Sequence, residues 1–249
     1  MPELLGAALV DIGGTLWPNS WPVRATDGPG RLERLTAVLP ALAPDRAAAL
    51  CDDLVTRSRD LNGGTVMIPE LIRVEADALV AMCLRDHDVP PEPALVTRVR
   101  RAMAIPIDAQ FQPLEGAGEL LQTIRELGLR CVIASNTYWR DADSYWDDFR
   151  LLGWAGNIDA VVTSVDAGHL KPHPAVFELA VRAAGVPAEQ CIVIGNKEAN
   201  DVEPALALGM RAILVHPDDP KPEATRAHVV APDLWACAQA LKAMLGGGA

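Results

Sequence analysis

Short apolar segments recur along this chain, and each of them ends at a polar residue or a glycine. They cover residues 7–10, 130–134, 160–162, 191–194 and 212–215. Helical periodicity fills much of the sequence between and after them, at residues 118–127, 175–184, 201–208 and 232–245. Continuous apolar strands alternating with helices are typical of a parallel sheet covered by helices on both faces. We therefore predict an α/β fold built on a parallel sheet.

The region between residues 17 and 111 lacks this alternation and shows only helical patterns. Candidate helices cover residues 31–39, 45–61, 69–86 and 91–104, with prolines and a glycine pair between them. A helical insertion above the carboxyl edge of a sheet is positioned to serve as a lid. We predict a core formed by residues 1–16 and 112–249, and an α-helical cap formed by residues 17–111.

Composition and charge exclude several classes of function. The net charge of -11 argues against a nucleic-acid partner, because phosphate contacts require a basic surface. No apolar stretch approaches the roughly 20 residues of a membrane helix. The first apolar segment has no basic leader and runs directly into Asp11, so we expect a cytoplasmic protein without membrane association. The five scattered cysteines fit neither a zinc site nor a disulfide framework.

Four polar stretches lie at or after the ends of the apolar segments. They are Asp-Ile-Gly-Gly-Thr-Leu at 11–16, Ser-Asn-Thr at 135–137, Lys-Pro at 171–172 and Gly-Asn-Lys-Glu-Ala-Asn-Asp at 195–201. Ligands of parallel α/β sheets bind at the carboxyl ends of the strands. We therefore expect the four stretches to meet in one functional site.

The order and spacing of these stretches, with a helical insertion after the first, resemble the haloacid dehalogenase (HAD) superfamily. The resemblance is to the subfamily with a helical cap, and it covers essentially the whole chain. It implies a Rossmann-like α/β core and a phosphatase-type hydrolase that acts on a small phosphorylated metabolite. It also implies that Asp11 is a nucleophile that forms a covalent aspartyl intermediate.

The same resemblance implies roles for the other motif residues. Ser135, or Thr137 as its alternative, would donate a hydrogen bond to the transferred group. Lys171 would neutralise negative charge, and Asp201 would hold Lys171 or a metal-bound water. Mg²⁺ is the implied cofactor, and its expected ligands are Asp11, Gly13, Asn196 and Asp201. The residues expected to bind substrate are Gly13, Gly14, Thr15, Asn136, Trp17, Tyr138 and Trp139.

The last three of these belong to a group of aromatic residues that follows the first two motifs. Trp21, Tyr145 and Trp146 complete the group. Aromatic rings serve well at apolar interfaces, so we expect these side chains mainly to join cap and core. A substrate with a planar or apolar part is the alternative interpretation.

Two positions depart from the pattern of HAD phosphatases. Gly13 stands where those enzymes usually carry a second aspartate, which acts as general acid and base, and Asn196 stands where they usually carry another aspartate. Positioned acid–base catalysis contributes about 10²–10⁴-fold to a rate. We therefore predict atypical or weak activity on generic phosphate esters. His169 and Glu198 are candidate replacements for the missing acid.

Other members of the superfamily provide alternatives. Haloacid dehalogenases need no metal and no second aspartate, and they use a cap arginine to bind the substrate carboxylate. The candidate arginines here are Arg24, Arg31, Arg34, Arg57, Arg59 and Arg73. Phosphonoacetaldehyde hydrolases need a cap lysine, and residues 17–111 contain none. A binding protein that has lost turnover is the third alternative.

Overall fold

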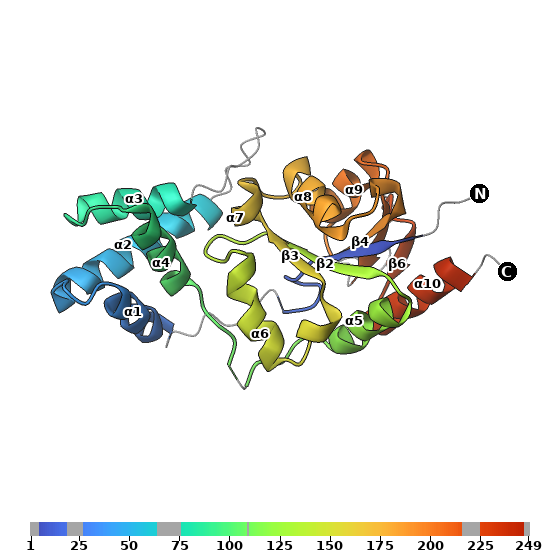
Figure 1. The fold of residues 1–249 in the computed structure, drawn as a ribbon, viewed down its shortest axis with the longest axis horizontal. Helices are drawn as coiled ribbons and strands as arrows, with labels where there is room; N and C mark the ends of the chain where they lie inside the picture. The colour runs from blue at the N-terminus through green and yellow to red at the C-terminus, as the bar shows by residue number, and fades with distance from the viewer. Residues whose placement is uncertain (1–4, 19–26, 64–75, 109, 216–224, 247–249) are drawn as a thin grey trace.

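A parallel sheet of six strands, in the order β3-β2-β1-β4-β5-β6, organises the larger part of the structure (Figure 1). The computed structural model describes residues 5–18, 27–63, 76–108, 110–215 and 225–246. The strands are β1 (Ala7–Val10), β2 (Arg130–Ser135), β3 (Ala160–Thr163), β4 (Cys191–Gly195), β5 (Arg211–Val215) and β6 (Val229–Ala231).

The order of the strands reverses at β1. The chain builds the sheet outward from β1 to β3, then returns to place β4 on the other side of β1. The carboxyl ends of β1 and β4 therefore lie side by side. In open α/β sheets this point of reversal is where ligands bind.

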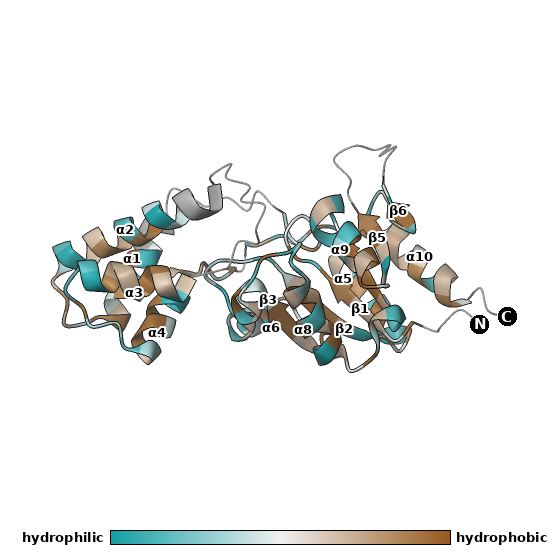
Figure 2. Cartoon of the chain, turned by 90° about the horizontal axis from the view of Figure 1, so that it is seen from above, coloured by the Kyte–Doolittle hydropathy of each residue, from teal (hydrophilic) through white to brown (hydrophobic). Residues whose placement is uncertain are grey.

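Alternate residues of each strand face opposite sides of the sheet. In β1, Ala8 and Val10 belong to one apolar cluster, and Ala7 and Leu9 belong to the other. The helices that cover the first face are α5 (Ala117–Glu126) and α10 (Leu234–Gly246), and those on the second are α8 (Pro174–Ala184) and α9 (Glu203–Ala207). Figure 2 shows hydrophobic residues concentrated in the strands between these helices. Burial on both faces explains why the strands are uninterrupted apolar runs.

Short helical segments connect the strands. They are η1 (Ala142–Tyr145), α6 (Trp146–Leu151), η2 (Ala155–Asn157), α7 (Ser164–Ala167), η3 (Ala188–Gln190) and the π-helical turn η4 (Glu198–Val202).

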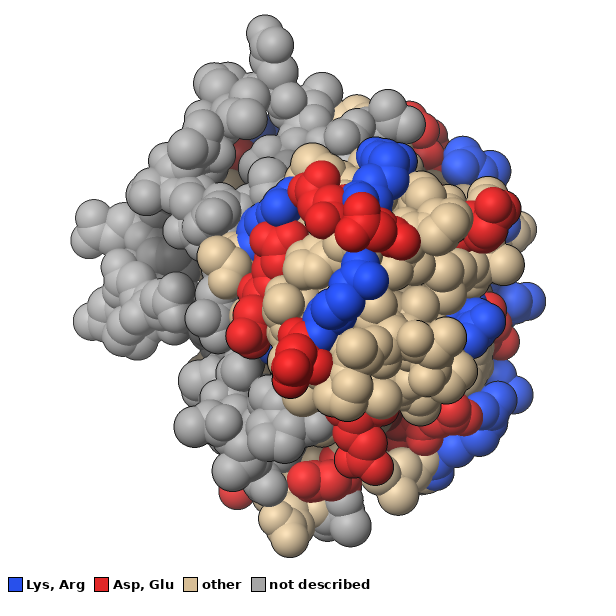
Figure 3. Space-filling view, turned by 90° about the vertical axis from the view of Figure 1, so that its left-hand side faces the viewer, with Lys and Arg blue, Asp and Glu red and all other residues tan. Residues whose placement is uncertain are grey.

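Four helices inserted after β1 form a second unit at one end of the molecule (Figure 1). They are α1 (Asp27–Val38), α2 (Pro44–Gly63), α3 (Ala76–Asp86) and α4 (Pro93–Met103). These helices, which we call the cap, surround their own apolar cluster, with Leu35, Leu54 and Met103 fully buried. On the outer face of this end, acidic and basic side chains are interspersed among uncharged ones (Figure 3).

Two arginines of α1 fasten the cap helices together. Arg31 Nε donates to the carbonyl of Met103 at 3.1 Å. Arg34 donates to the carbonyls of Ala102 at 3.0 Å and Ala104 at 2.9 Å. These carbonyls end α4 and have no partner within the helix, so the guanidinium groups satisfy them.

The predicted fold class is confirmed, and the five predicted strands lie within one residue of their expected ends. Strand β6 was not predicted, because it has three residues and Val230 is exposed, which leaves too short a pattern to read. The predicted cap helices at 31–39, 45–61 and 91–104 correspond to α1, α2 and α4. The helix predicted at 69–86 corresponds to α3 from residue 76 onward, and its first seven residues lie outside the described ranges.

The domain boundaries at residues 17 and 111 stay a prediction. In the part of the chain that the structure describes, no helix is long and apolar enough to cross a bilayer.

Candidate active site

Asp11 lies at the carboxyl end of β1, where the strand order reverses. Its backbone N–H donates to the carbonyl of Ile194 at 2.9 Å, which continues the pairing of β1 with β4. Beyond Asp11 the chain turns sharply, because Leu16 N–H bonds back to Ile12 at 2.8 Å. Gly14 has a φ of 77° within this turn, a conformation that favours glycine.

The turn also brings Thr15 back to Asp11. Thr15 Oγ1 donates to Asp11 Oδ2 at 3.0 Å, and the threonine side chain is fully buried. The hydrogen bond holds one carboxylate oxygen of Asp11 in place. The local motif therefore explains why threonine stands four residues after the aspartate.

The second carboxylate oxygen pairs with Lys171. Lys171 Nζ lies 2.8 Å from Asp11 Oδ1, 2.6 Å from Asp201 Oδ1 and 3.0 Å from the carbonyl of Ala134. All three charged side chains are buried, with 7 % of Asp11, 5 % of Lys171 and 1 % of Asp201 exposed. Three residues from separate motifs thus form one triad, with one positive charge between two negative charges.

Asn136 places the backbone of Lys171. Its Nδ2 donates to the carbonyl of Lys171 at 3.0 Å, and its Oδ1 accepts from the backbone N–H of Lys171 at 2.7 Å. The side-chain amide therefore pairs with Lys171 as a peptide group of a neighbouring strand would. Substrate binding by Asn136 stays a prediction, and the observed contacts give it a structural role that the sequence did not reveal.

Asp201 reaches the site from η4 and fits against a glycine. Its Oδ2 accepts from the backbone N–H of Lys197 at 3.1 Å. A Cβ atom at Gly195 would overlap the Asp201 side chain, so position 195 requires glycine. Close packing against Asp201 therefore explains why the fourth motif begins with glycine.

Burial and charge act on this triad in opposite directions. Burial raises the pKa of the Asp11 carboxyl above its ordinary value, and Asp201 adds to the effect, while Lys171 and Thr15 oppose it. Burial alone would lower the pKa of Lys171, but attraction to Asp11 and Asp201 outweighs it and raises the pKa well above the ordinary value. Lys171 is therefore a permanent cation at neutral pH.

The expected magnesium ligands lie at this edge of the sheet, and their chemistry limits how they could bind a cation. No group of three or more His, Cys, Asp or Glu side chains suited to a metal occurs among the described residues. Asp11 and Asp201 already share Lys171, and Gly13 and Asn196 offer only neutral carbonyl oxygens. Mg²⁺ is commonly held by one or two carboxylates together with substrate phosphate and water. This donor set fits a cation bound jointly with a phosphorylated substrate.

Ser135 is the last residue of β2, the strand that pairs with β1, and it is buried. The next residue but one, Thr137, is fixed by Ser164, whose Oγ accepts from Thr137 N–H at 2.8 Å and donates to its carbonyl at 2.7 Å. The phenol of Tyr145 interacts with the side chains of Ser135 and Thr137, and burial raises the pKa of this phenol. Sequence reasoning gave no role to Ser164.

The aromatic residues divide between core and cap. Trp17 lies in a core cluster, 5.1 Å from the ring of Phe111 and 5.7 Å from that of Tyr145. Tyr138 and Trp139 pack instead against the apolar cluster of the cap. Trp21 lies outside the described residues. Substrate contact by Trp17, Tyr138 and Trp139 stays a prediction.

The candidate replacements for the missing acid have other contacts. Glu198 accepts hydrogen bonds from Thr225 Oγ1 at 2.6 Å and Arg226 N–H at 2.8 Å. The ring of His169 stacks on His173 at 3.9 Å.

The cap arginines considered for a substrate carboxylate likewise serve the cap. Arg31 and Arg34 bind α4, and Arg57 pairs with Asp53 at 2.7 Å and Asp86 at 2.8 Å. Arg24, Arg73 and the Arg59 side chain lie outside the described residues.

Comparisons with known proteins agree with this arrangement. A sequence model of the haloacid dehalogenase-like hydrolases matches residues 5–209. The chain is 35 % identical over 105 residues to a haloacid dehalogenase-like hydrolase domain-containing protein 3 of Xenopus laevis, covering 42 % of this chain and 41 % of that protein. It is 33 % identical over 121 residues to a glyceraldehyde 3-phosphate phosphatase of Methanothermobacter thermautotrophicus, covering 49 % and 51 % respectively. The aligned region thus spans about half the length of each relative.

Solved structures share the fold over nearly the whole chain. A HAD phosphatase from Thermococcus onnurineus superposes with a TM-score of 0.57 at 20 % identity, covering 98 % of this chain and 99 % of that one. A 2-haloacid dehalogenase from Pseudomonas syringae gives 0.58 at 21 % identity, covering 97 % and 99 %. The family match over residues 5–209, on a sheet that gathers the four motifs at one edge, shows that this chain belongs to the haloacid dehalogenase-like hydrolases.

Proposed function

We propose that this protein hydrolyses a phosphate monoester of a small metabolite through a covalent intermediate on Asp11. The observation that carries the proposal is the buried triad of Asp11, Lys171 and Asp201 at the reversal point of the sheet. A carboxylate held by a lysine and a threonine is oriented for attack, and the lysine remains to balance the charge that a phosphate brings.

The reaction would proceed in two steps, formation and hydrolysis of an aspartyl phosphate. A carboxylate oxygen of Asp11 forms a bond to phosphorus while the ester P–O bond breaks and the leaving oxygen departs. Since Gly13 has no side chain to donate a proton, the leaving oxygen takes its proton from water. Water then cleaves the aspartyl phosphate, which releases inorganic phosphate and restores Asp11.

Lys171 would act throughout by electrostatics. Its ammonium neutralises the transferred phosphoryl group, and its raised pKa keeps it from acting as a proton donor. Asp11, Asp201 and the carbonyl oxygens of Gly13 and Asn196 would hold Mg²⁺ together with the substrate phosphate. A bound Mg²⁺ supplies further charge neutralisation at the phosphoryl oxygens.

The named relatives support phosphate esters as the substrate class. Glyceraldehyde 3-phosphate phosphatases from several archaea match this chain, at 25–33 % identity over about half of its length. The substrate of those proteins is a small phosphorylated metabolite by name. We take the same class, and no particular member of it, as the substrate here.

One observation favours a second candidate, the metal-free hydrolysis of a carbon–halogen bond. Gly13 provides no acid, and a halide leaves without needing a proton. The single cation of Lys171 already faces the nucleophile. In this reaction Asp11 would form an ester with the substrate carbon as the halide departs, and water would cleave the ester.

The test is a panel of small phosphate esters and 2-haloacids, assayed for phosphate and halide release with Mg²⁺ and with EDTA. We expect Mg²⁺-dependent phosphate release that disappears in Asp11→Asn. Asp147→Asn, at an exposed carboxylate, is the matched control and should retain activity. Halide release in EDTA would replace the proposal with the second candidate. Activity that survives in Asp11→Asn would exclude covalent catalysis at this residue.

A further inference from the structure

One loop of the core enters the cap. After β2 and Asn136, the chain places Tyr138 and Trp139 against the apolar cluster formed by the cap helices. The two rings meet edge to face, with centroids 4.8 Å apart. The loop of residues 137–145, which we call the coupling loop, therefore supplies side chains to the core of the other unit.

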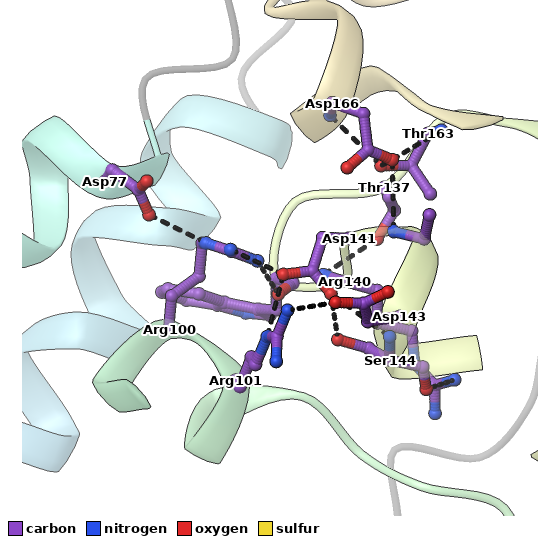
Figure 4. A network of polar contacts seen from close by, with 12 residues as sticks. Asp77, Arg100, Arg101, Thr137, Arg140, Asp141, Asp143, Ser144, Thr163 and Asp166 are labelled. Carbon is purple, nitrogen blue, oxygen red and sulfur yellow. Dashed lines mark hydrogen bonds and ion pairs between the residues drawn. The ribbon is translucent and has the colours of Figure 1, made fainter. Parts of the chain in front are cut away.

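Arg100 of α4 fastens this loop from the side of the cap (Figure 4). Only 3 % of the residue is exposed. Its Nη1 donates to the carbonyl of Trp139 at 2.9 Å, and its Nη2 donates to Asp141 Oδ2 at 2.7 Å. Nε donates to Asp77 of α3 at 2.7 Å. One buried guanidinium thus joins two cap helices to the backbone and a side chain of the coupling loop.

Asp141 is the matching anion, and 7 % of it is exposed. Its Oδ1 accepts from Ser144 N–H at 3.1 Å and Ser144 Oγ at 2.6 Å, which caps η1. Its Oδ2 accepts from Arg100 and from Arg101 Nε at 2.8 Å. Burial opposes ionisation here, but these hydrogen bonds outweigh it and hold the pKa of the carboxyl well below its usual range. Asp141 is therefore a carboxylate at all physiological pH values.

The other contacts of the coupling loop fix it to α7 of the core. Thr137 is bonded to Ser164 at both its N–H and its carbonyl, and Ala142 N–H donates to Asp166 at 3.0 Å. Immediately before the loop, Asn136 holds the backbone of Lys171. Arg100 therefore holds the backbone at Trp139, and three residues earlier in the same segment Asn136 holds the backbone of Lys171, which pairs with Asp11.

We propose that the buried Arg100–Asp141 pair is a latch that makes the cap and the coupling loop one body, and that Arg100 is a positioning residue for Lys171. The inference rests on the proposed function for its kinetic part. With the latch intact, the placement of the cap sets the position of Asn136 and, through it, of the Lys171 ammonium. With the latch broken, Trp139 leaves the cap cluster and the triad loses its alignment.

The experiment uses the full chain labelled with 5-fluorotryptophan and follows the ¹⁹F resonances of its six tryptophans. Trp139→Phe assigns the Trp139 signal, and Trp154→Phe assigns a buried reference in the core. In Arg100→Gln we expect the Trp139 signal to move or broaden while the Trp154 signal stays in place. The kcat on the best phosphate ester should fall about 10- to 100-fold, because small misplacements of catalytic groups cost that much.

Arg101→Gln is the matched control. Arg101 binds the same oxygen of Asp141 but has 44 % of its side chain exposed, so its loss should lower kcat less than about fivefold. Trp139 should keep its resonance in this variant. An unchanged Trp139 signal in Arg100→Gln, or equal effects of the two arginine variants, would overturn the latch.

Kinetics and a double variant distinguish a positioning role of Arg100 from a contribution to stability alone. Each variant is assayed at a temperature where circular dichroism shows it fully folded, so that kcat refers to folded enzyme. The loss of kcat in Arg100→Gln combined with Asp141→Asn should be smaller than the sum of the two single losses, because both substitutions remove the Arg100–Asp141 contact. Additive losses would contradict the proposal. If the wild-type chain releases no phosphate, the proposed function fails, and the ¹⁹F comparison still decides whether the latch exists.

Discussion

Lys171 Nζ lies 2.8 Å from Asp11 Oδ1, although the two residues are 160 positions apart in the chain. The contact joins the first and third motifs at the point where the strand order reverses. Because Lys171 also pairs with Asp201 at 2.6 Å, its cation balances two buried carboxylates at once. The stability and the chemistry of the site therefore depend on the same side chain.

Lys171→Met should lower both the stability of the fold and the activity of the site. The substitution leaves Asp11 and Asp201 as buried carboxylates without a cation, and removing one partner of a buried pair costs about 3–5 kcal/mol. Urea unfolding at neutral pH measures this loss. At acid pH the loss should shrink, because burial raises the pKa of the Asp11 carboxyl and its protonation removes one of the two unpaired charges. Lys197→Met is the control, since Lys197 is exposed and its hydrogen bonds with Asp201 are made by its backbone N–H and carbonyl.

The pH dependence of kcat/KM should report the raised pKa of Asp11. The nucleophile must be a carboxylate, and burial raises its pKa above the ordinary 3.8, so activity should be lost at a pH above that value as the solution is acidified. Lys171 has a raised pKa and stays charged below its ordinary 10.5, so its charge should not limit activity at neutral pH. A pH–rate profile on a phosphate ester with constant ionisation checks both statements. An acid limb at or below pH 3.8 would contradict the first.

Gly195→Ala should displace Asp201. The added Cβ would overlap the Asp201 side chain, and overpacking of this kind costs about 1–3 kcal/mol. Turnover should fall as well, because Asp201 holds one side of Lys171. Gly156→Ala is the matched control, since a Cβ there meets nothing within 4 Å. Thermal melts and kcat for the two alanine variants measure the difference, and equal values would show that the site adjusts freely.

Gly13→Asp should raise the phosphatase rate on esters with poor leaving groups. Position 13 does not have a positive φ, so a side chain fits its backbone, whereas Gly14 has a φ of 77°. A positioned acid contributes about 10²-fold or more when the leaving oxygen needs a proton. Alkyl phosphates should therefore gain much more than p-nitrophenyl phosphate, whose leaving group is a weak base. Gly14→Asp, strained at its backbone, should gain nothing, and an equal response of both substrates would exclude acid catalysis by residue 13.

Much of the fold and the location of the site could be read from the sequence. Uninterrupted apolar runs specify strands buried on both faces, and such strands are parallel with their carboxyl ends at one edge. The ends of the first two strands therefore placed Asp11 and Ser135 at one edge, and the motif resemblance added Lys171, which the structure pairs with Asp11. Edge strand β6 escaped prediction because three residues, one of them exposed, carry too little pattern. The capping box of Thr163 and Asp166 was readable as a Thr-x-x-Asp pattern, but its neighbour Ser164 showed no sign of its bond to Thr137.

The sequence by itself determined the residues that meet at the sheet edge, because hydrophobic periodicity and motif spacing are local properties of the chain. Only the tertiary structure decided how those residues pair. It bonds the Asn136 amide to the backbone of Lys171, and it joins Arg100 to Asp141 across 41 positions. Neither contact follows from periodicity, because hydrogen bonds between distant segments depend on how loops and helices pack in three dimensions. Asp11 could be identified at the end of the first strand from the sequence, whereas its contacts with Lys171 and Thr15 were decided by the packing of the whole molecule.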